Sequence, residues 1–396
     1  MMPDTSIYLH IPFCKHRCAY CDFNTYAGQE SLIPDYVDAL IHEINTIGRQ
    51  SAGLSDDRIS VHTVFFGGGT PSLLSGPQLT SILNALRAAF TFRPEVETTL
   101  EANPGTTSLD FLHQIRAAGF NRLSFGVQSA NPEELHMLER AHDFFDVIRS
   151  IKWARQAGFV NLNLDLIFGL PEQTLERWQN TVQRIVDLHP EHISVYALTL
   201  EHGTPFGRWS SRGLLPLPDP DLAADMYEWA GEYLATNGYL QYEISNWAGN
   251  DSYWMCRHNL QYWRGFSYLG FGAGAHGYAS GLRYSNVLRI KTYIERLVDS
   301  RVSDLPFPLS PAVVNHHNLT RRDDMGEFMM TGLRLTREGI SSIEFESRFG
   351  TRLEDVYGRE VEELTRLGLI ERDVARLRLT PRGRLLGNQV FMKFVD

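Results

Sequence analysis

Short apolar stretches alternate with longer amphipathic stretches from Ser6 to about Leu200. The short stretches predict β-strands, and the longer ones, in which apolar residues recur every three or four positions, predict helices. The expected strands are Ile7–His10, Thr63–Phe66, Thr98–Glu101, Arg122–Phe125, Leu162–Ile167 and His192–Leu198. The expected helices are Ile33–Ile47, Gln78–Phe90, Leu109–Ala118, Asp143–Ala157 and Leu175–Leu188. Three of these helices are expected to end at a glycine: Gly48, Gly119 and Gly158.

Six strand–helix repeats predict an α/β fold built on a parallel sheet, which right-handed crossovers curl into a partial (β/α)6 barrel. In such folds the functional residues collect at the carboxyl ends of the strands. Polar or glycine-rich positions fall there repeatedly, at Cys14, Gly67–Pro71, Glu101–Pro104, Gln128 and Asp165. We therefore expect these positions to face one site.

The sequence changes character after Leu200. A stretch punctuated by Gly and Pro, Gly203–Pro220, precedes an expected helix, Asp221–Asn237, and an aromatic, Gly-rich region, Tyr239–Tyr284. The last part predicts a winged-helix-like module with the order helix, strand, strand, helix, at Val361–Gly368, Leu369–Asp373, Arg376–Thr380 and Pro381–Gly387. We expect a barrel core over residues 1–205, an extension over 206–310 and an α+β carboxyl-terminal module over 311–396.

Composition narrows the class of protein. Hydrophobic residues make up 43% of the 396 residues and charged residues 21%, as in ordinary soluble proteins, and no apolar run reaches the roughly 18 residues of a membrane span. The start, MMPDTSIYLHIPF, lacks the pattern of a secretion signal, so the cytoplasm is the expected location. A net charge of −10 without a long Lys/Arg run argues against nucleic-acid binding and favours small molecules or proteins as partners. The same acidity favours a structural or lid role for the winged module.

Three of the four cysteines, Cys14, Cys18 and Cys21, fall within eight positions. Four cysteines are too few for a disulfide framework in this chain, so the spacing indicates metal ligation. Thiolates select iron–sulfur clusters, zinc or copper(I), and a structural zinc site needs a fourth ligand. Three thiolates on a four-iron cluster instead leave one iron open. The alternative is a zinc site completed by His10, His16 or Cys256, although Cys256 alone is expected to be a buried structural thiol.

The string from Cys14 to Cys21 is similar to the C-x3-C-x2-C signature of the radical S-adenosylmethionine superfamily, with its aromatic residue, here Tyr20, before the last cysteine. The resemblance implies a [4Fe–4S] cluster on the three cysteines, whose open iron binds the methionyl amino and carboxylate groups of S-adenosylmethionine. It also implies that the cofactors carry the radical chemistry, while the protein orients them and excludes water and oxygen.

The same resemblance implies the lining of the adenosylmethionine pocket. Gly68, Gly69 and Thr70 would bring the backbone close to the ligand, since glycine lacks a Cβ. Glu101 would meet the sulfonium end or the ribose, and the pocket would be completed by Gln128, Arg140, Asp165, Tyr20 and Tyr8. A guanidinium suits a carboxylate, and a carboxylate suits ribose hydroxyls. The alternatives are a plain turn at the glycines and ordinary ion pairs or helix caps at the charged residues.

A longer string narrows the resemblance. Tyr8-Leu-His-Ile-Pro-Phe-Cys14, followed by Cys21-Asp-Phe23, resembles the coproporphyrinogen dehydrogenase-like subgroup over nearly the whole chain. That subgroup contains an oxygen-independent coproporphyrinogen III dehydrogenase, which is an oxidative decarboxylase of heme synthesis, and a branch of heme chaperones. The dehydrogenases carry a further cysteine at the position of Phe23 and an extra segment before the first strand, where only six residues precede Ile7. Both differences favour the chaperone branch.

The segment His258-Asn259-Leu-Gln-Tyr262-Trp263 matches the HNxxYW pattern that the resemblance links to heme binding. An imidazole is a common axial ligand of heme iron, Tyr and Trp rings can cover the macrocycle, and Asn259 can orient the imidazole or meet a propionate. The alternative is a structural histidine beside packed aromatic residues. A Gly-rich stretch nearby supplies a second imidazole, His276.

We therefore expect a chain that binds a [4Fe–4S] cluster, S-adenosylmethionine and heme. We expect it to deliver heme to acceptor hemoproteins of the respiratory chain, with transient contact at the membrane. The competing hypothesis is oxidative decarboxylation of coproporphyrinogen III. A third hypothesis, a DNA-binding regulator with the cluster as redox sensor, fits the acidic charge poorly.

Overall fold

The computed structural model describes residues 5–53, 58–298, 305–373 and 376–395. The chain divides into two compact units. The first comprises Met1–Glu232 and Ser267–His317, and the second comprises Tyr233–Phe266 and Asn318–Asp396. Residues 233–266 of the expected extension therefore belong to the second unit, and the division into 1–205, 206–310 and 311–396 stays a prediction.

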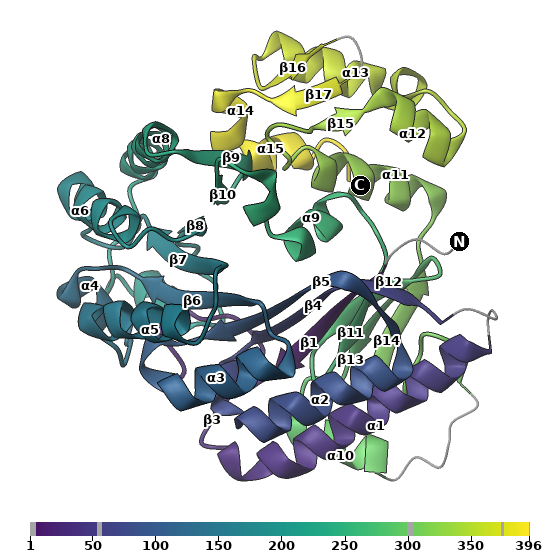
Figure 1. The fold of residues 1–396 in the computed structure, drawn as a ribbon. Coiled ribbons are helices and arrows are strands. Elements are labelled where there is room, and N and C mark those ends of the chain that lie inside the picture. The colour runs from purple at the N-terminus through teal and green to yellow at the C-terminus, as the bar shows by residue number, and fades with distance from the viewer. Residues whose placement is uncertain (1–4, 54–57, 299–304, 374–375, 396) are drawn as a thin grey trace. The chain divides into compact units, whose positions relative to one another are not determined.

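Six parallel strands form the centre of the first unit (Figure 1). They are neighbours in chain order: β1 (Thr5–Ile11), β4 (Ser60–Gly68), β5 (Thr91–Ala102), β6 (Arg122–Gln128), β7 (Leu162–Phe168) and β8 (His192–Ala197). Their apolar residues are buried, as in β1, where Ile7, Leu9 and Ile11 are fully buried. A parallel sheet needs cover on both faces, which explains these apolar runs. The α/β fold with a partial (β/α)6 barrel, predicted from the sequence, is confirmed.

Helices connect these strands. The expected ones are α1 (Ile33–Ala52), α2 (Gly76–Ala89), α3 (Leu109–Ala118), α5 (Phe144–Gln156) and α6 (Leu175–Val186). The short helix α4 (Pro132–Met137) precedes α5 between β6 and β7. After β8 come α7 (Pro205–Ser211) and α8 (Pro220–Thr236), which begins in the first unit and ends in the second. Ser75 and Asp143 begin α2 and α5 with capping boxes, which satisfy free backbone N–H groups.

The prediction that a glycine ends the helix is right for α3 and wrong for α1. Gly119 ends α3 with a left-handed backbone, at φ 113°. The prediction that Gly48 ends a helix is wrong, because α1 continues through it to Ala52. A Cβ on Gly48 would lie 2.6 Å from the Cβ of Ala89, so this glycine allows α1 and α2 to approach closely.

The sheet of the first unit continues beyond β1. The strand β11 (Tyr268–Phe271) lies parallel to β1, and β12 (His276–Ala279), β13 (Leu282–Asn286) and β14 (Val313–Asn318) follow it, with α10 (Ile290–Val298) between the last two. The sequence analysis did not predict these strands. They are four to six residues long, and β11 and β12 each contain a glycine, which weakens the strand signal.

Glu43 on α1 ties this added sheet to the barrel. Its buried carboxylate accepts four hydrogen bonds, from the Gly272 N–H (2.9 Å), the Asn286 amide (2.9 Å), the Tyr293 hydroxyl (2.6 Å) and the Ser310 hydroxyl (2.7 Å). Burial raises the pKa of this carboxyl, and the four hydrogen bonds oppose the rise. One acceptor thus joins α1 to residues 229 to 267 positions later in the chain.

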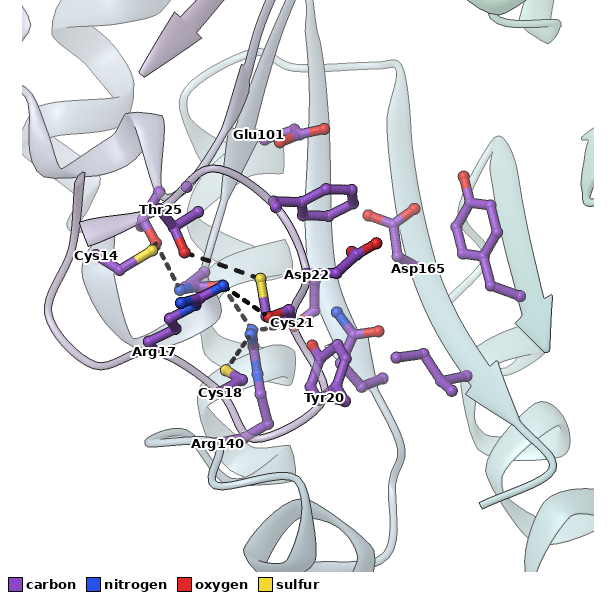
Figure 2. A pocket seen from close by; sticks show the side chains of 18 of the residues that line it. Cys14, Arg17, Cys18, Tyr20, Cys21, Asp22, Thr25, Glu101, Arg140 and Asp165 are labelled. Atoms are coloured by element: carbon purple, nitrogen blue, oxygen red, sulfur yellow. Dashed lines mark hydrogen bonds between the residues drawn. The ribbon is translucent and has the colours of Figure 1, made fainter. Parts of the chain in front are cut away.

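The carboxyl end of β1 leads into the loop that carries the three cysteines (Figure 2). Two short strands, β2 (Phe13–Cys14) and β3 (Tyr26–Ala27), pair in parallel at the two ends of this loop. The Tyr26 N–H also donates to the Pro12 carbonyl at 2.8 Å. The loop is therefore closed where it leaves and rejoins the sheet.

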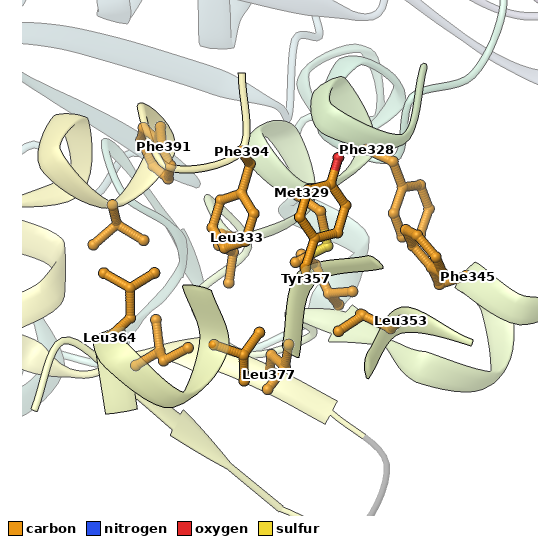
Figure 3. Packing of buried hydrophobic residues seen from close by; sticks show 14 of the residues in the cluster. Phe328, Met329, Leu333, Phe345, Leu353, Tyr357, Leu364, Leu377, Phe391 and Phe394 are labelled. Carbon is orange, nitrogen blue, oxygen red and sulfur yellow. The ribbon is translucent and has the colours of Figure 1, made fainter. Parts of the chain in front are cut away.

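The second unit contains a hairpin and a helical module. The hairpin is β9 (Tyr239–Glu243) and β10 (Asn246–Gly249), and α9 (Arg257–Trp263) follows it. The module contains α11 (Arg321–Gly332), β15 (Ile340–Ser341), α12 (Ser342–Phe349), α13 (Leu353–Arg366), β16 (Ile370–Arg372), β17 (Arg376–Leu379), α14 (Pro381–Leu385) and α15 (Gly387–Phe391). Its core packs Phe328, Phe345, Tyr357 and Phe394 (Figure 3). The winged order of helix, strand, strand and helix is confirmed, with β17 between β15 and β16.

Candidate cofactor site

The three cysteines stand on one loop of the first unit. Cys14 is buried at the end of β2, and Cys18 and Cys21 are half-buried on a turn that the Cys21 N–H closes onto the Cys18 carbonyl at 3.1 Å. None of the three forms a disulfide. Burial raises the pKa of the Cys14 and Cys21 thiols, so their thiolate forms need a positive partner. Bound iron supplies such a charge, since a coordinating thiol is deprotonated by the metal.

The residues proposed to complete a zinc site are engaged elsewhere. His10 contacts the Tyr8 hydroxyl at 3.0 Å through Nδ1 and the Asn24 carbonyl at 2.9 Å through Nε2. His16 contacts Glu139 at 3.0 Å. Cys256 belongs to the second unit, where it is fully buried as expected for a structural thiol. Within the described ranges, no three His, Cys, Asp or Glu side chains are grouped as the ligands of a single metal ion.

The glycine run after β4 lies against the cysteine loop. The Gly69 N–H donates to the Ile11 carbonyl at 2.9 Å, and the Thr70 N–H donates to the Phe13 carbonyl at 2.8 Å. A Cβ on Gly69 would lie 2.6 Å from the Phe13 oxygen and 3.1 Å from the Cys14 sulfur. Gly68 has a left-handed backbone, at φ 112°, and its N–H donates to Glu101 at 3.1 Å. Gly69 therefore allows the backbone to approach the cysteine loop closely, and the expected approach of this run to a ligand stays a prediction.

A pocket of about 450 Å³ opens beside the cysteines, within the usual range for a small-molecule site. All predicted cofactor residues of the first unit except Tyr8 line it: Cys14, Cys18, Tyr20, Cys21, Gly68, Gly69, Thr70, Glu101, Gln128, Arg140 and Asp165. Figure 2 shows the carboxylates of Glu101 and Asp165 set apart from the three sulfurs. Tyr8 is half-buried and lies near Glu101.

The carboxyl groups of Glu101 and Asp165 differ in the hydrogen bonds that they accept. Burial and the nearby Asp165 raise the pKa of Glu101 to about 8, against the opposing hydrogen bond from Gly68. Asp165 accepts from the Ser124 hydroxyl at 3.0 Å and from the Asn163 amide at 2.8 Å. Burial raises the pKa of Asp165 as well, and these hydrogen bonds oppose the rise. Asp165 is thus fixed by its neighbours, whereas Glu101 has one oxygen bound to a backbone N–H.

Arg140 directs its guanidinium toward the protein. One terminal nitrogen donates to Asn103 Oδ1 at 2.5 Å and to the Gly126 carbonyl at 2.7 Å. The other donates to the Cys18 sulfur at 3.6 Å. The sequence analysis did not single out Asn103, although it follows β5 directly in the string Glu101-Ala-Asn-Pro104. That position at a strand end was the available signal.

Gln128 also has an unusual position, with a left-handed backbone at φ 68° beside a register shift between β6 and β7. Such bulges re-aim side chains at functional sites, and this one turns Gln128 into the pocket wall. Tyr196 to Thr199 and Glu201, at and after the end of β8, line the pocket too. They were not predicted as site residues.

The HNxxYW residues lie in the second unit, on α9. His258 is 1% exposed, and its Nε2 is 3.1 Å from the Tyr262 hydroxyl. The two rings meet edge to face, with centroids 5.0 Å apart. Asn259, Tyr262 and Trp263 are half-buried, and the Arg334 guanidinium lies over the Trp263 ring at 4.3 Å. His258 and Tyr262 therefore form one ring pair, while Trp263 contacts Arg334.

Comparisons with known proteins identify the family. The chain is 39% identical to a protein named heme chaperone HemW from Bacillus subtilis (strain 168), over 98% of this chain and 99% of that protein. It is 35% identical to the protein of the same name from Escherichia coli (strain K12), over 100% and 99% of the two chains. The chain belongs to the HemW family. The family model of the radical SAM superfamily matches residues 8–185 of this chain, and that of the HemN C-terminal domain matches residues 319–386.

A solved structure agrees with the family. Coproporphyrinogen III oxidase (HemN) from Escherichia coli, described as a radical SAM enzyme, is 27% identical to the chain with a TM-score of 0.82, covering 99% of this chain and 90% of that one. Membership of the radical SAM superfamily implies a [4Fe–4S] cluster and S-adenosylmethionine.

In the parts of the chain that the structure describes, every helix is too short or too polar to cross a bilayer.

The residues of the first unit fit these two groups. Three thiols without disulfides face a pocket of suitable volume, and a glycine run without side chains borders it. The Nε of Arg140 is buried there with no hydrogen-bond partner in the protein. A buried unpaired donor is costly, so it indicates a polar group that joins the site.

Proposed function

We propose that this HemW-family chain binds heme and delivers it to acceptor hemoproteins of the respiratory chain. In this proposal it also carries a [4Fe–4S] cluster on Cys14, Cys18 and Cys21, and S-adenosylmethionine in the adjoining pocket. The observation that carries the proposal is the HNxxYW segment on α9, in a chain that matches proteins named heme chaperone HemW over its full length. We place this activity in the cytoplasm, with transient contact at the membrane where acceptors are found.

The residues of the first unit would each have a defined task. The three thiolates hold the cluster, and the glycine run leaves room for the cofactor beside it. Glu101, Gln128 and Asp165 face the pocket from three strand ends and can bind the polar groups of adenosylmethionine, with Tyr20 beside the cluster and Tyr8 near Glu101. When bound, the cluster and the sulfonium supply one-electron chemistry.

The second unit would hold the heme. Binding of iron to His258 Nε2 requires that this nitrogen give up the Tyr262 hydroxyl, which now lies 3.1 Å away. The rings of Tyr262 and Trp263 can then cover the macrocycle, and Asn259 can donate to a propionate. Because His258 is 1% exposed, heme binding also requires a local opening around α9.

Hemin titration under anaerobic conditions tests the proposal. The wild-type chain should bind hemin saturably, His258→Ala should weaken binding at least tenfold, and Tyr262→Phe should keep it, since the imidazole remains. His113→Ala, an exposed histidine on α3, is the matched control and should bind like the wild type. Binding by His258→Ala at wild-type affinity would remove His258 from the account.

Oxidative decarboxylation of coproporphyrinogen III is the second candidate. It is favoured by the similarity to HemN, with its TM-score of 0.82. It is disfavoured by Phe23, which stands where the dehydrogenase pattern carries a further cysteine. Anaerobic incubation with coproporphyrinogen III and S-adenosylmethionine decides between the two, because the dehydrogenase would form protoporphyrinogen and the chaperone would form none.

The charges of the winged module do not favour a DNA-binding regulator. The helix that precedes the paired strands is the one that reads DNA in helix-turn-helix folds, and here it is α13. Five carboxylates lie along this helix: Glu354, Asp355, Glu360, Glu362 and Glu363. A phosphate backbone would be repelled by such a helix.

A further inference from the structure

Two of the cluster thiols receive hydrogen bonds from a continuous set of side chains. The Thr70 hydroxyl donates to the Cys14 sulfur at 3.6 Å, and Arg140 donates to the Cys18 sulfur at 3.6 Å. Asn103 joins these two donors, since its Nδ2 donates to Thr70 Oγ1 at 3.1 Å and its Oδ1 accepts from Arg140 at 2.5 Å. Four hydrogen bonds therefore connect Cys14 to Cys18 through Thr70, Asn103 and Arg140.

The chemistry of the side chains fixes the direction of each bond. A guanidinium has no acceptor, so Arg140 must face the Oδ1 of Asn103 and not its amide nitrogen. The Asn103 amide group is then left for Thr70, whose oxygen accepts from it. Since that oxygen already accepts from Asn103, its own proton is available for the Cys14 sulfur. Both ends of the chain of bonds thus donate to sulfur.

The barrel positions these three residues independently. Thr70 follows β4 and is 4% exposed, with its N–H bound to the Phe13 carbonyl. Asn103 follows β5. Arg140 is anchored to the Gly126 carbonyl of β6 at 2.7 Å. Two neighbouring strand ends contribute Thr70 and Asn103, and Arg140, which follows α4 (Pro132–Met137), is bonded to the backbone of the third strand.

The third cysteine is supported from its own loop, by the backbone of Phe23 and the side chain of Thr25. The Thr25 hydroxyl lies 4.0 Å from the Cys21 sulfur, at the limit of such a contact. Cys21 is also half-buried, whereas Cys14 is 8% exposed. The donors that Asn103 joins therefore reach Cys14 and Cys18, whereas Cys21 is bonded within its own loop.

We propose that Thr70, Asn103 and Arg140 act as positioning residues, which hold the Cys14 and Cys18 thiolates by hydrogen bonds and raise the reduction potential of the cluster. The inference rests on the cluster binding of the proposed function and goes beyond it, because it assigns Thr70 and Arg140 to the cluster sulfurs and adds Asn103. Hydrogen bonds to cluster sulfurs stabilise the more negative, reduced state, and residues around the ligands orient them.

A redox titration of the reconstituted chain without S-adenosylmethionine tests the proposal, with the reduced cluster measured by electron paramagnetic resonance. Thr70→Val keeps the shape of the side chain and removes the donor, so at a fixed potential the ratio of reduced to oxidised cluster should fall about tenfold, a shift of about 59 mV. Asn103→Ala should shift the potential in the same direction. Thr70→Ser keeps the hydroxyl and should behave like the wild type. Thr107→Val, at a buried threonine bonded to Pro104 and Ser150, is the control and should leave the potential unchanged.

The outcomes separate this proposal from the function on which it rests. If the wild type itself binds no iron and sulfide, the proposed function fails. If Thr70→Val and Asn103→Ala hold a full cluster at the wild-type potential, the proposed effect of these hydrogen bonds on the reduction potential is refuted. This holds even where Thr70→Val weakens adenosylmethionine binding. Loss of iron from Thr70→Val but not from Thr70→Ser supports the positioning role. Loss from both variants overturns it.

Discussion

Gly69 should control the position of Cys14, the first of the three proposed cluster ligands. A Cβ at this residue would lie 2.6 Å from the Phe13 carbonyl oxygen, 3.0 Å from the Ile11 carbonyl oxygen and 3.1 Å from the Cys14 sulfur. Gly69 does not have a left-handed backbone, so an alanine would add steric strain alone. The substitution Gly69→Ala therefore tests close backbone approach directly.

The size of the effect follows from these distances. Ordinary contact begins near 3.4 Å, so the Phe13 carbonyl must retreat by about 0.8 Å. That carbonyl also accepts the Thr70 N–H at 2.8 Å, and the retreat stretches this hydrogen bond. Overpacking costs about 1–3 kcal/mol and a weakened hydrogen bond about 1 kcal/mol. Because Phe13 precedes Cys14, the same movement displaces the thiol.

Two measurements check this prediction. Urea unfolding of the cluster-free chain should show Gly69→Ala less stable by about 2–4 kcal/mol. After anaerobic reconstitution the variant should hold less than half of the wild-type iron and sulfide. Gly105→Ala is the matched control, since its Cβ would meet nothing closer than His142 at 3.8 Å. If Gly69→Ala matches Gly105→Ala in both measurements, the steric reasoning is refuted.

Two further substitutions test the carboxylates of Glu43 and Glu101. Glu43→Gln would replace one carboxylate oxygen, which accepts two of the four hydrogen bonds, by an amide nitrogen, and should lower the unfolding free energy by about 2–3 kcal/mol in urea. The exposed Glu30→Gln should change it little. Glu101→Gln should change the pH dependence of stability in the cofactor-free protein. Because the folded-state pKa of Glu101 is raised to about 8, the native state binds this proton more tightly, and wild-type stability should fall as pH rises from about 4.5 to about 8. The variant should lose that slope, and parallel pH curves for the two proteins would contradict the assignment.

The barrel could be predicted because its signal is local and repeated. Its six predicted strands are short segments separated by five periodic helices, and the right-handed crossover leaves few ways to join such units. The added strands β11 to β14 could not be predicted in this way. The strand β11 pairs with β1, which lies about 260 residues earlier in the sequence. Its four residues, which end in Gly270 and Phe271, show no alternation of apolar and polar positions.

In the site, too, the sequence predicted which residues share a pocket but not which atoms they contact. Strand-end logic predicted that Thr70, Glu101, Gln128 and Asp165 share one pocket, and the structure places them there. It did not predict that the Arg140 fork binds Asn103 and the Gly126 carbonyl. That choice depends on the turn after α4, where Glu139 has a left-handed backbone at φ 55°, and on distances that a sequence pattern does not contain.

On the short helix α9, one side-chain contact could be predicted from sequence spacing alone. His258 and Tyr262 are four positions apart and so lie on one helix face, where the structure joins them at 3.1 Å. Spacing does not reveal that the imidazole is 1% exposed, and burial decides what the pair can do. In the proposed heme binding, iron on Nε2 of the buried His258 replaces the Tyr262 hydroxyl, so the free energy of that binding must include the cost of breaking this hydrogen bond.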